Sequence, residues 1–158
     1  MRYIVLILVL FIHGLVRGQA PCECTLTGEN TDRSVLLSSG NKNCQALGFE
    51  RYAEELMKEK KLDSAMFCLE NALNYYLFSN CPASRKAAVY KQMAAVAENK
   101  TDFTGSLSFN LKALELAEKD NNGMEQASLL LNIAQVFNRL KQSDKGIQYA
   151  RNAIPFVE

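Results

Sequence analysis

The fold of this chain is decided by residues 49–72, FERYAEELMKEKKLDSAMFCLENA, and by two later segments written to the same pattern. The second segment is YKQMAAVAENKTDFTGSLSFNLKA at 90–113, and the third is LLNIAQVFNRLKQSDKGIQYARNA at 130–153. They begin 41 and 40 residues apart, and each places a bulky residue first and small residues at its fifth, seventeenth and twenty-fourth positions. A period of this size is typical of a solenoid of helical hairpins, in which each unit buries its apolar face against its neighbour.

The sequence around the repeats predicts where the helices and units lie. From Cys44 onward apolar residues recur at spacings of three and four, which is the period of an amphipathic helix. We therefore expect an all-α domain over 44–158, built from three antiparallel hairpins. Their approximate boundaries are 44–82, 83–122 and 123–158. Residues 19–43 are rich in Gly, Ser, Asn and Thr, and indicate an irregular, cysteine-containing lead-in with room for one short helical turn.

The first eighteen residues have the pattern of a signal peptide. Arg2 precedes an apolar run at 3–12, and small residues follow around Gly18. The run is shorter than the roughly 20 apolar residues that a membrane-spanning helix needs, which favours a cleaved signal over an anchor. We expect cleavage after Gly18 and an extracytoplasmic location, periplasmic or secreted, with no membrane span left in the mature chain.

The composition of the mature chain excludes several classes of function. Cleavage would remove Arg2 and Arg17, leaving 16 basic and 17 acidic residues. This chain lacks the basic excess that nucleic-acid binding requires. Cleavage would also remove His13, the single histidine, and with it any His-dependent triad or metal site. We therefore expect no catalytic residue, no cofactor and no metal ligand, and a protein that is not an enzyme.

The five cysteines predict disulfides. An exported chain meets an oxidising compartment, and an odd count leaves at least one thiol over. Cys44 should open the first helix and Cys81 should follow its antiparallel partner, so the two are candidates for one bridge; Cys24 is the alternative partner of Cys44. Cys22 and Cys24 favour structural bridging over a redox motif, and Cys68 is expected in the core.

The twelve repeating positions resemble the unit of the tetratricopeptide repeat (TPR) family, a pair of antiparallel helices. In this chain they are Phe49, Ala53, Ala65 and Ala72, then Tyr90, Ala94, Ser106 and Ala113, then Leu130, Ala134, Gly146 and Ala153. The resemblance implies a right-handed superhelical solenoid. The period exceeds the usual 34 residues and is similar to that of long-unit bacterial extracytoplasmic arrays. Asn110 occupies a position that is usually apolar, so Phe109 or Leu111 is expected to pack in its place.

The family resemblance also implies a ligand surface. Its members usually hold ligands along the concave face formed by the first helix of each hairpin. Carried over by position, this predicts a protein or peptide partner on Glu50, Glu54, Met57, Lys58, Lys91, Ala95, Glu98, Asn99, Leu131, Gln135 and Asn138. These residues do not supply the carboxylate clamp of chaperone-binding members, so a chaperone tail is not the expected ligand.

The sequence thus predicts a non-catalytic scaffold that binds a protein or peptide outside the cytoplasm. One alternative is a fragment of the sensory ectodomain of a bacterial signalling receptor, which an apolar run of about 20 residues downstream would identify. A second alternative is a thiol-based redox protein, which would need one exposed thiol of low pKa. The last helix carries no polar closing helix after it, which indicates self-association through that helix or a longer protein.

Overall fold

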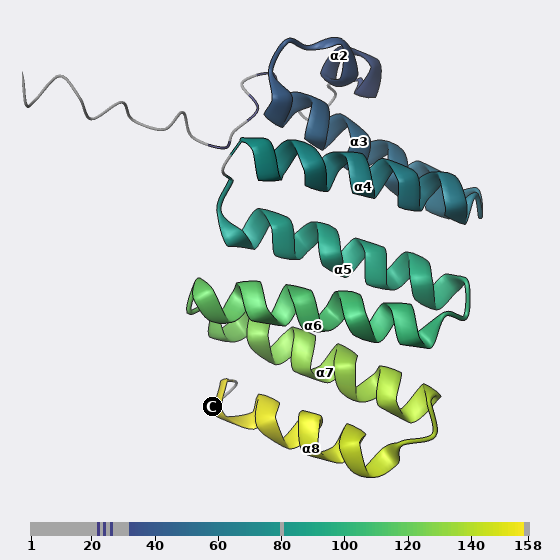
Figure 1. The fold of residues 1–158 in the computed structure, drawn as a ribbon, viewed down its shortest axis with the longest axis vertical. Coiled ribbons are helices and arrows are strands. Elements are labelled where there is room, and N and C mark those ends of the chain that lie inside the picture. Colours follow the sequence, from purple (N-terminus) through teal and green to yellow (C-terminus); the bar gives the residue numbers. More distant parts are fainter. Residues whose placement is uncertain (1–21, 23, 25, 27–31, 80, 157–158) are drawn as a thin grey trace, which may run out of the picture.

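A computed structural model describes residues 22, 24, 26, 32–79 and 81–156, so the predicted signal peptide at 1–18 lies outside the described residues. Helices follow one another with short turns and pack in chain order (Figure 1). Their bounds are α2 Arg33–Ser38, α3 Lys42–Lys58, α4 Leu62–Phe78, α5 Ala83–Asn99, α6 Phe103–Lys119, α7 Gly123–Arg139 and α8 Ser143–Ala153, followed by the short 3-10 helix η1 Ile154–Phe156.

The helices form three hairpins, α3 with α4, α5 with α6 and α7 with α8, stacked along one axis (Figure 1). The second helix of each of the first two hairpins packs against the first helix of the next, through α4 with α5 and α6 with α7. No strand occurs in the described part of the chain. The predicted all-α helical-repeat fold is confirmed.

The turn inside each hairpin has the same backbone geometry in all three hairpins. Lys60, Thr101 and Lys141 follow the three first helices and share a left-handed backbone, with φ of 61°, 59° and 59°. In each turn the next residue donates its N–H to a carbonyl five residues back, at 2.8 to 2.9 Å. This bond satisfies a carbonyl left open at the helix end. The common turn fixes how each second helix folds back on its first.

Small residues lie where the paired helices cross, as the repeat predicts. Ala53, Ala65 and Ala72 are fully buried in the first hairpin, and Ala113 is equally buried in the second. Small side chains let the two backbones approach, while aromatic rings fill the space beside them. The first hairpin holds Phe49 stacked on Tyr75, with 5.9 Å between ring centres.

Asn110 departs from the sequence-based expectation. It is completely buried on α6, whereas Leu111 is exposed and Phe109 is only partly buried, stacked on Tyr90. The Asn110 amide donates to the Ser106 carbonyl at 3.1 Å and lies 3.3 Å from the Ser106 hydroxyl. Phe109 packs against the first core as expected, whereas Leu111 does not. Asn110 is nevertheless buried as well, because this local bonding lets its amide occupy the core. Its Oδ1 has no hydrogen-bond partner within the described residues.

The lead-in is tied to the first hairpin by two disulfides. Cys24 pairs with Cys44 and Cys22 with Cys81, with Cα–Cα distances of 4.6 and 5.2 Å. The bridge expected between Cys44 and Cys81 is wrong, and the alternative partner of Cys44 is the one observed. The physical reason is that the lead-in lies beside this end of the hairpin and offers each helix cysteine its own partner.

The α2 helix covers the amino-terminal half of α3. Leu36 of α2 is completely buried. It lies so close to Gly48 of α3 that a Cβ added at Gly48 would be 3.0 Å from the Leu36 Cβ. Glycine at this position therefore permits the close approach of the two helices. Arg33 extends this cap, with its guanidinium 4.2 Å from the ring centre of Tyr52 and an ion pair to Glu55.

Candidate protein-binding surface

The first helices of the three hairpins are linked directly to one another. On α5, the Gln92 amide donates to Glu54 of α3 at 3.3 Å. The neighbouring Lys91 forms an ion pair with Glu125 of α7, with 2.9 Å between Nζ and Oε1. Polar contacts therefore run from α3 to α5 and from α5 to α7, and these helices lie side by side along one side of the stack.

Because the three helices share one register, residues one repeat apart form rows across this side. Glu54, Ala95 and Gln135 form one row; Glu54 and Gln135 are exposed, and Ala95 is half-buried between them. Met57, Glu98 and Asn138 form the next row. Met57 packs partly into the first core, while Glu98 and Asn138 are exposed.

Two further predicted residues lie at helix ends. Lys58 is the last residue of α3 and Asn99 the last of α5, one repeat apart and both exposed. The Asn99 amide donates to the Ala95 carbonyl at 2.9 Å, which fixes the side chain while its amide oxygen stays open to a ligand. Glu98 accepts a hydrogen bond from the Ser106 hydroxyl at 3.0 Å.

Glu50 is a correction to the predicted surface. Its side chain is only 7% exposed, and its carboxylate accepts a hydrogen bond from the hydroxyl of Tyr76, a completely buried residue of α4. Burial raises the pKa of Glu50, and the Tyr76 hydrogen bond and the nearby Arg85 charge oppose the rise. Glu50 therefore holds the first hairpin together and is not accessible to a partner.

The other residues of the Glu50 row are more open. Lys91 is half-buried and engaged by Glu125, while Leu131 on α7 is 46% exposed. The first-helix surface is therefore defined here as the seven predicted residues that are exposed: Glu54, Lys58, Glu98, Asn99, Leu131, Gln135 and Asn138.

Sequence reasoning missed Gln92 and Glu125, which connect the three first helices. Their contacts join residues 38 and 34 positions apart, so no local spacing reveals them. The opposite charges of Lys91 and Glu125 on consecutive first helices were the available signal, since neighbouring first helices should be close in any such array.

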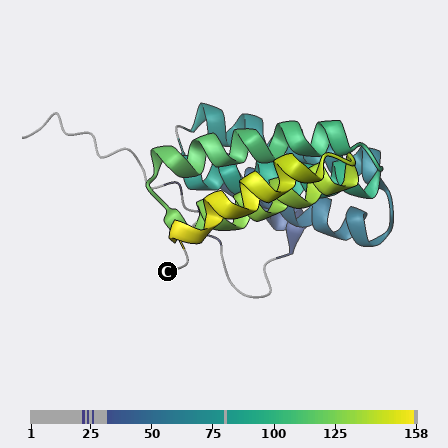
Figure 2. The same ribbon diagram turned by 90° about the horizontal axis from the view of Figure 1, so that it is seen from below.

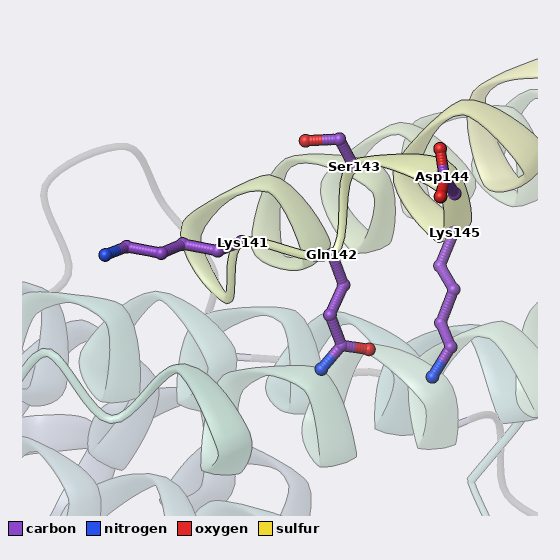
Figure 3. A pocket seen from close by; sticks show the side chains of 5 residues that line it. All are labelled: Lys141, Gln142, Ser143, Asp144 and Lys145. Carbon is purple, nitrogen blue, oxygen red and sulfur yellow. The ribbon is translucent and has the colours of Figure 1, made fainter.

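Two hollows elsewhere on the described surface are weaker candidates for a ligand site. One is lined by five consecutive exposed residues, Lys141 to Lys145, which form the turn before α8 and the first turn of that helix. There Gln142 and Lys145 point the same way and Lys141 points away (Figure 3). A second lies over the first hairpin, between Tyr52 and Leu56 of α3 and Phe67 of α4. Neither brings together several polar groups aimed at one point, as a small-molecule site requires.

The described residues include a free thiol and side chains of the types that can ligate a metal ion. They hold no cluster of three or more His, Cys, Asp or Glu side chains suited to a metal ion. Cys68 is the free cysteine; it is buried, and burial raises the pKa of its thiol. In the same part of the chain, no helix combines the length and apolar character needed to cross a membrane.

Comparison with known proteins places the fold but not the family. No protein-family model and no curated protein matches the chain. The fold is similar to that of aspartyl phosphate phosphatase F from Bacillus subtilis, with a TM-score of 0.70 and 19% identity over 78% of this chain. It is also similar to BtubC (BKLC) from P. vanneervenii, with a TM-score of 0.66 and 15% identity over 72% of this chain.

This chain spans 32% of the phosphatase structure and 46% of the BtubC structure. At these identities the likeness shows the fold alone: an all-helical repeat architecture compatible with the TPR resemblance.

Proposed function

We propose that this chain is an exported, non-catalytic scaffold that binds a segment of another protein along its first-helix surface. The observation that carries this proposal is the set of exposed side chains that three parallel helices bring into register. A solenoid of this kind presents such a surface without a deep cavity, which suits an extended protein segment better than a small molecule.

The chemistry of the first-helix surface favours an extended segment as the ligand. Asn99, Gln135 and Asn138 carry amides, each of which both donates and accepts hydrogen bonds. Amides of this kind match the alternating N–H and C=O groups of a main chain, while Leu131 offers an apolar contact beside them. Such a surface holds the ligand by its backbone and selects one side chain at Leu131.

The charges on this surface are mixed. Glu54 and Glu98 are acidic and Lys58 is basic, so the surface has no strong field of one sign. Long-range steering of a highly charged partner therefore contributes little, and binding depends on contacts made after encounter. A ligand of low net charge fits this surface best.

Export is part of the proposal, and the disulfides support it. Four of the five cysteines are paired, and such bridges persist in oxidising compartments such as the periplasm or the extracellular space. The buried Cys68, with its raised pKa, argues against the alternative of a redox protein, which needs an exposed thiol of low pKa.

The test is selection of peptides from a random displayed library, followed by titration of the best one with the disulfide-bonded protein. Leu131→Glu should weaken binding about tenfold or more, because it puts a carboxylate at the apolar contact. Gln135→Ala should weaken it by a smaller factor.

The matched control for this titration is Ser108→Glu, which adds the same carboxylate at an exposed position of a second helix. It should leave the affinity unchanged. Peptides that bind the wild type and the Leu131→Glu variant equally well would show that the first-helix surface is not the binding site.

A further inference from the structure

The outer face of α8 corresponds by repeat position to the faces of α4 and α6 that the next hairpin covers, but on α8 this face is exposed. Leu73, Leu114 and Ile154 occupy one repeat position, 41 and 40 residues apart. Leu73 packs with α5 and Leu114 with α7, and each is 9% exposed, whereas Ile154, the first residue of η1 directly after α8, is 49% exposed.

A second repeat position shows the same difference. Met66 of α4 and Leu107 of α6 pack partly into the two cores, and Ile147 of α8 is 51% exposed. Viewed onto this end of the stack, α8 in yellow has no other helix in front of it (Figure 2). The apolar interface between successive hairpins therefore continues onto α8, where the described residues leave it open.

The open face of α8 carries an acidic residue before Ile147 and a basic residue after it along the helix. Asp144 and Arg151 are seven residues apart, two turns of helix, and so lie on one side of α8. Ile147 lies beside the line between them. If a second α8 packs antiparallel to the first, Asp144 of each copy lies opposite Arg151 of the other, and the two Ile147 side chains meet near the two-fold axis. The face is thus complementary to itself in charge.

The opposite end of the stack is not equivalent. There α2 covers the amino-terminal half of α3, with Leu36 buried and closely approaching Gly48. The disulfides join the lead-in to Cys44 near the start of α3 and to Cys81 between α4 and α5. A head-to-tail contact, with α8 of one copy on α3 of the next, would collide with this cap. A two-fold contact between two α8 helices avoids it.

We infer that the chain forms a two-fold symmetric dimer through α8, with Ile147 at its centre and reciprocal Asp144–Arg151 ion pairs on either side. The helix has 11 residues, so the contact falls at the small end of the range for specific interfaces. The dimer is consequently in equilibrium with monomer and its population rises with concentration.

The experiment is sedimentation velocity over a range of concentrations, using protein with its disulfides intact. The wild type should shift from one to two chain masses as concentration rises. Ile147→Asp should abolish the dimer without unfolding the chain, because this side chain is already half exposed. Leu77→Asp on α4, where the leucine is 55% exposed, is the matched control and should dimerise like the wild type.

Charge reversal then tests the geometry. Asp144→Arg and Arg151→Asp should each be monomeric alone, because like charges would face each other in both ion pairs. Mixed together, the two variants should form a heterodimer, since each acid again faces a base. The double variant should recover the wild-type dimer.

Three results would overturn the inference: a wild type that stays monomeric at all concentrations, a dimer that survives Ile147→Asp, or open-ended head-to-tail oligomers. The first result would leave the α8 face to a helix of another protein.

Discussion

The buried pair of Glu50 and Tyr76 gives a quantitative test of the packing in the first hairpin. The Tyr76 hydroxyl donates to the Glu50 carboxylate, and the Arg85 guanidinium lies 5.5 Å from the Tyr76 ring centre. Tyr76→Phe removes the donor and leaves a buried carboxylate without this hydrogen bond. A bond to a charged group contributes about 1.5 to 3 kcal/mol, so we expect the free energy of unfolding at pH 7 to fall by about that amount.

Glu50→Gln makes the pair neutral while keeping an acceptor for the hydroxyl. In this background Tyr76→Phe should cost only about 0.5 to 1.5 kcal/mol, as for an ordinary hydrogen bond. The double-mutant cycle should therefore give a coupling of about 1 kcal/mol between the two residues at pH 7. Tyr75→Phe, at a half-buried neighbouring tyrosine, is the control and should change stability by less than about 0.5 kcal/mol.

The pH dependence of stability follows from the raised pKa of Glu50. Burial raises the pKa of Glu50 above its ordinary value of 4.5, so the folded state holds this proton more tightly than the unfolded state. The stability contributed by the protonated Glu50 is fully present below pH 4.5 and is lost as pH rises through the raised pKa. Glu50→Gln should therefore gain stability relative to the wild type as pH rises across this window.

The measurement is urea unfolding followed by circular dichroism at pH 4 and pH 7, for the wild type, both single variants and the double variant. The cost of Tyr76→Phe should be smaller at pH 4, where Glu50 is neutral. A coupling below about 0.3 kcal/mol at pH 7, or a Tyr76→Phe cost independent of pH, would refute the assignment of a buried charged hydrogen bond.

Three further predictions concern the cysteines and the turns. The intact mass of the protein exported from a native-like host should show loss of the first 18 residues. Alkylation without reductant should label one cysteine, Cys68, and only after unfolding. Five reactive thiols would contradict the disulfide pairing. Replacing both Cys24 and Cys44 by serine should lower the free energy of unfolding by about 3 kcal/mol in chemical denaturation, since the bridge closes a sequence separation of 20 residues; no change would mean that the bridge does not constrain the unfolded chain. Thr101→Gly should raise the free energy of unfolding by about 0.5 to 1 kcal/mol, because glycine adopts the left-handed backbone without strain. The control Thr104→Gly in α6 should lower it by a similar amount. A lower free energy of unfolding for Thr101→Gly would contradict the turn geometry.

The sequence predicts the hairpins because the small residues repeat with the helix crossings. Ala53 and its counterparts must be small wherever two backbones approach, so their spacing reports the distance along the chain between one crossing and the next. The resemblance to the TPR family, and not this spacing, places residues such as Glu54 and Gln135 on one side. Local periodicity was sufficient for the hairpins themselves.

The features that the sequence did not predict depend on contacts between distant residues. Glu50 falls on the predicted surface by position, and only the rotation of α4 brings Tyr76, 26 residues later, against it. The connectivity of Cys44 depends on the path of the lead-in, which has no periodic signal. Asn110 enters the core because Ser106, one turn earlier, satisfies its amide donors. Each outcome is set by tertiary geometry, which overrides the expectation from position alone.

The central claim is that a protein segment binds across the first helices, and the most direct measurement maps that binding by NMR. The best peptide from the displayed library would be titrated into isotope-labelled, disulfide-bonded protein, at a concentration where the protein is monomeric. We predict that the largest shifts fall on α3, α5 and α7 around Glu54, Gln135 and Asn138, with α4, α6 and α8 little changed. Shifts centred on α4, α6 and α8 would contradict the proposed binding surface.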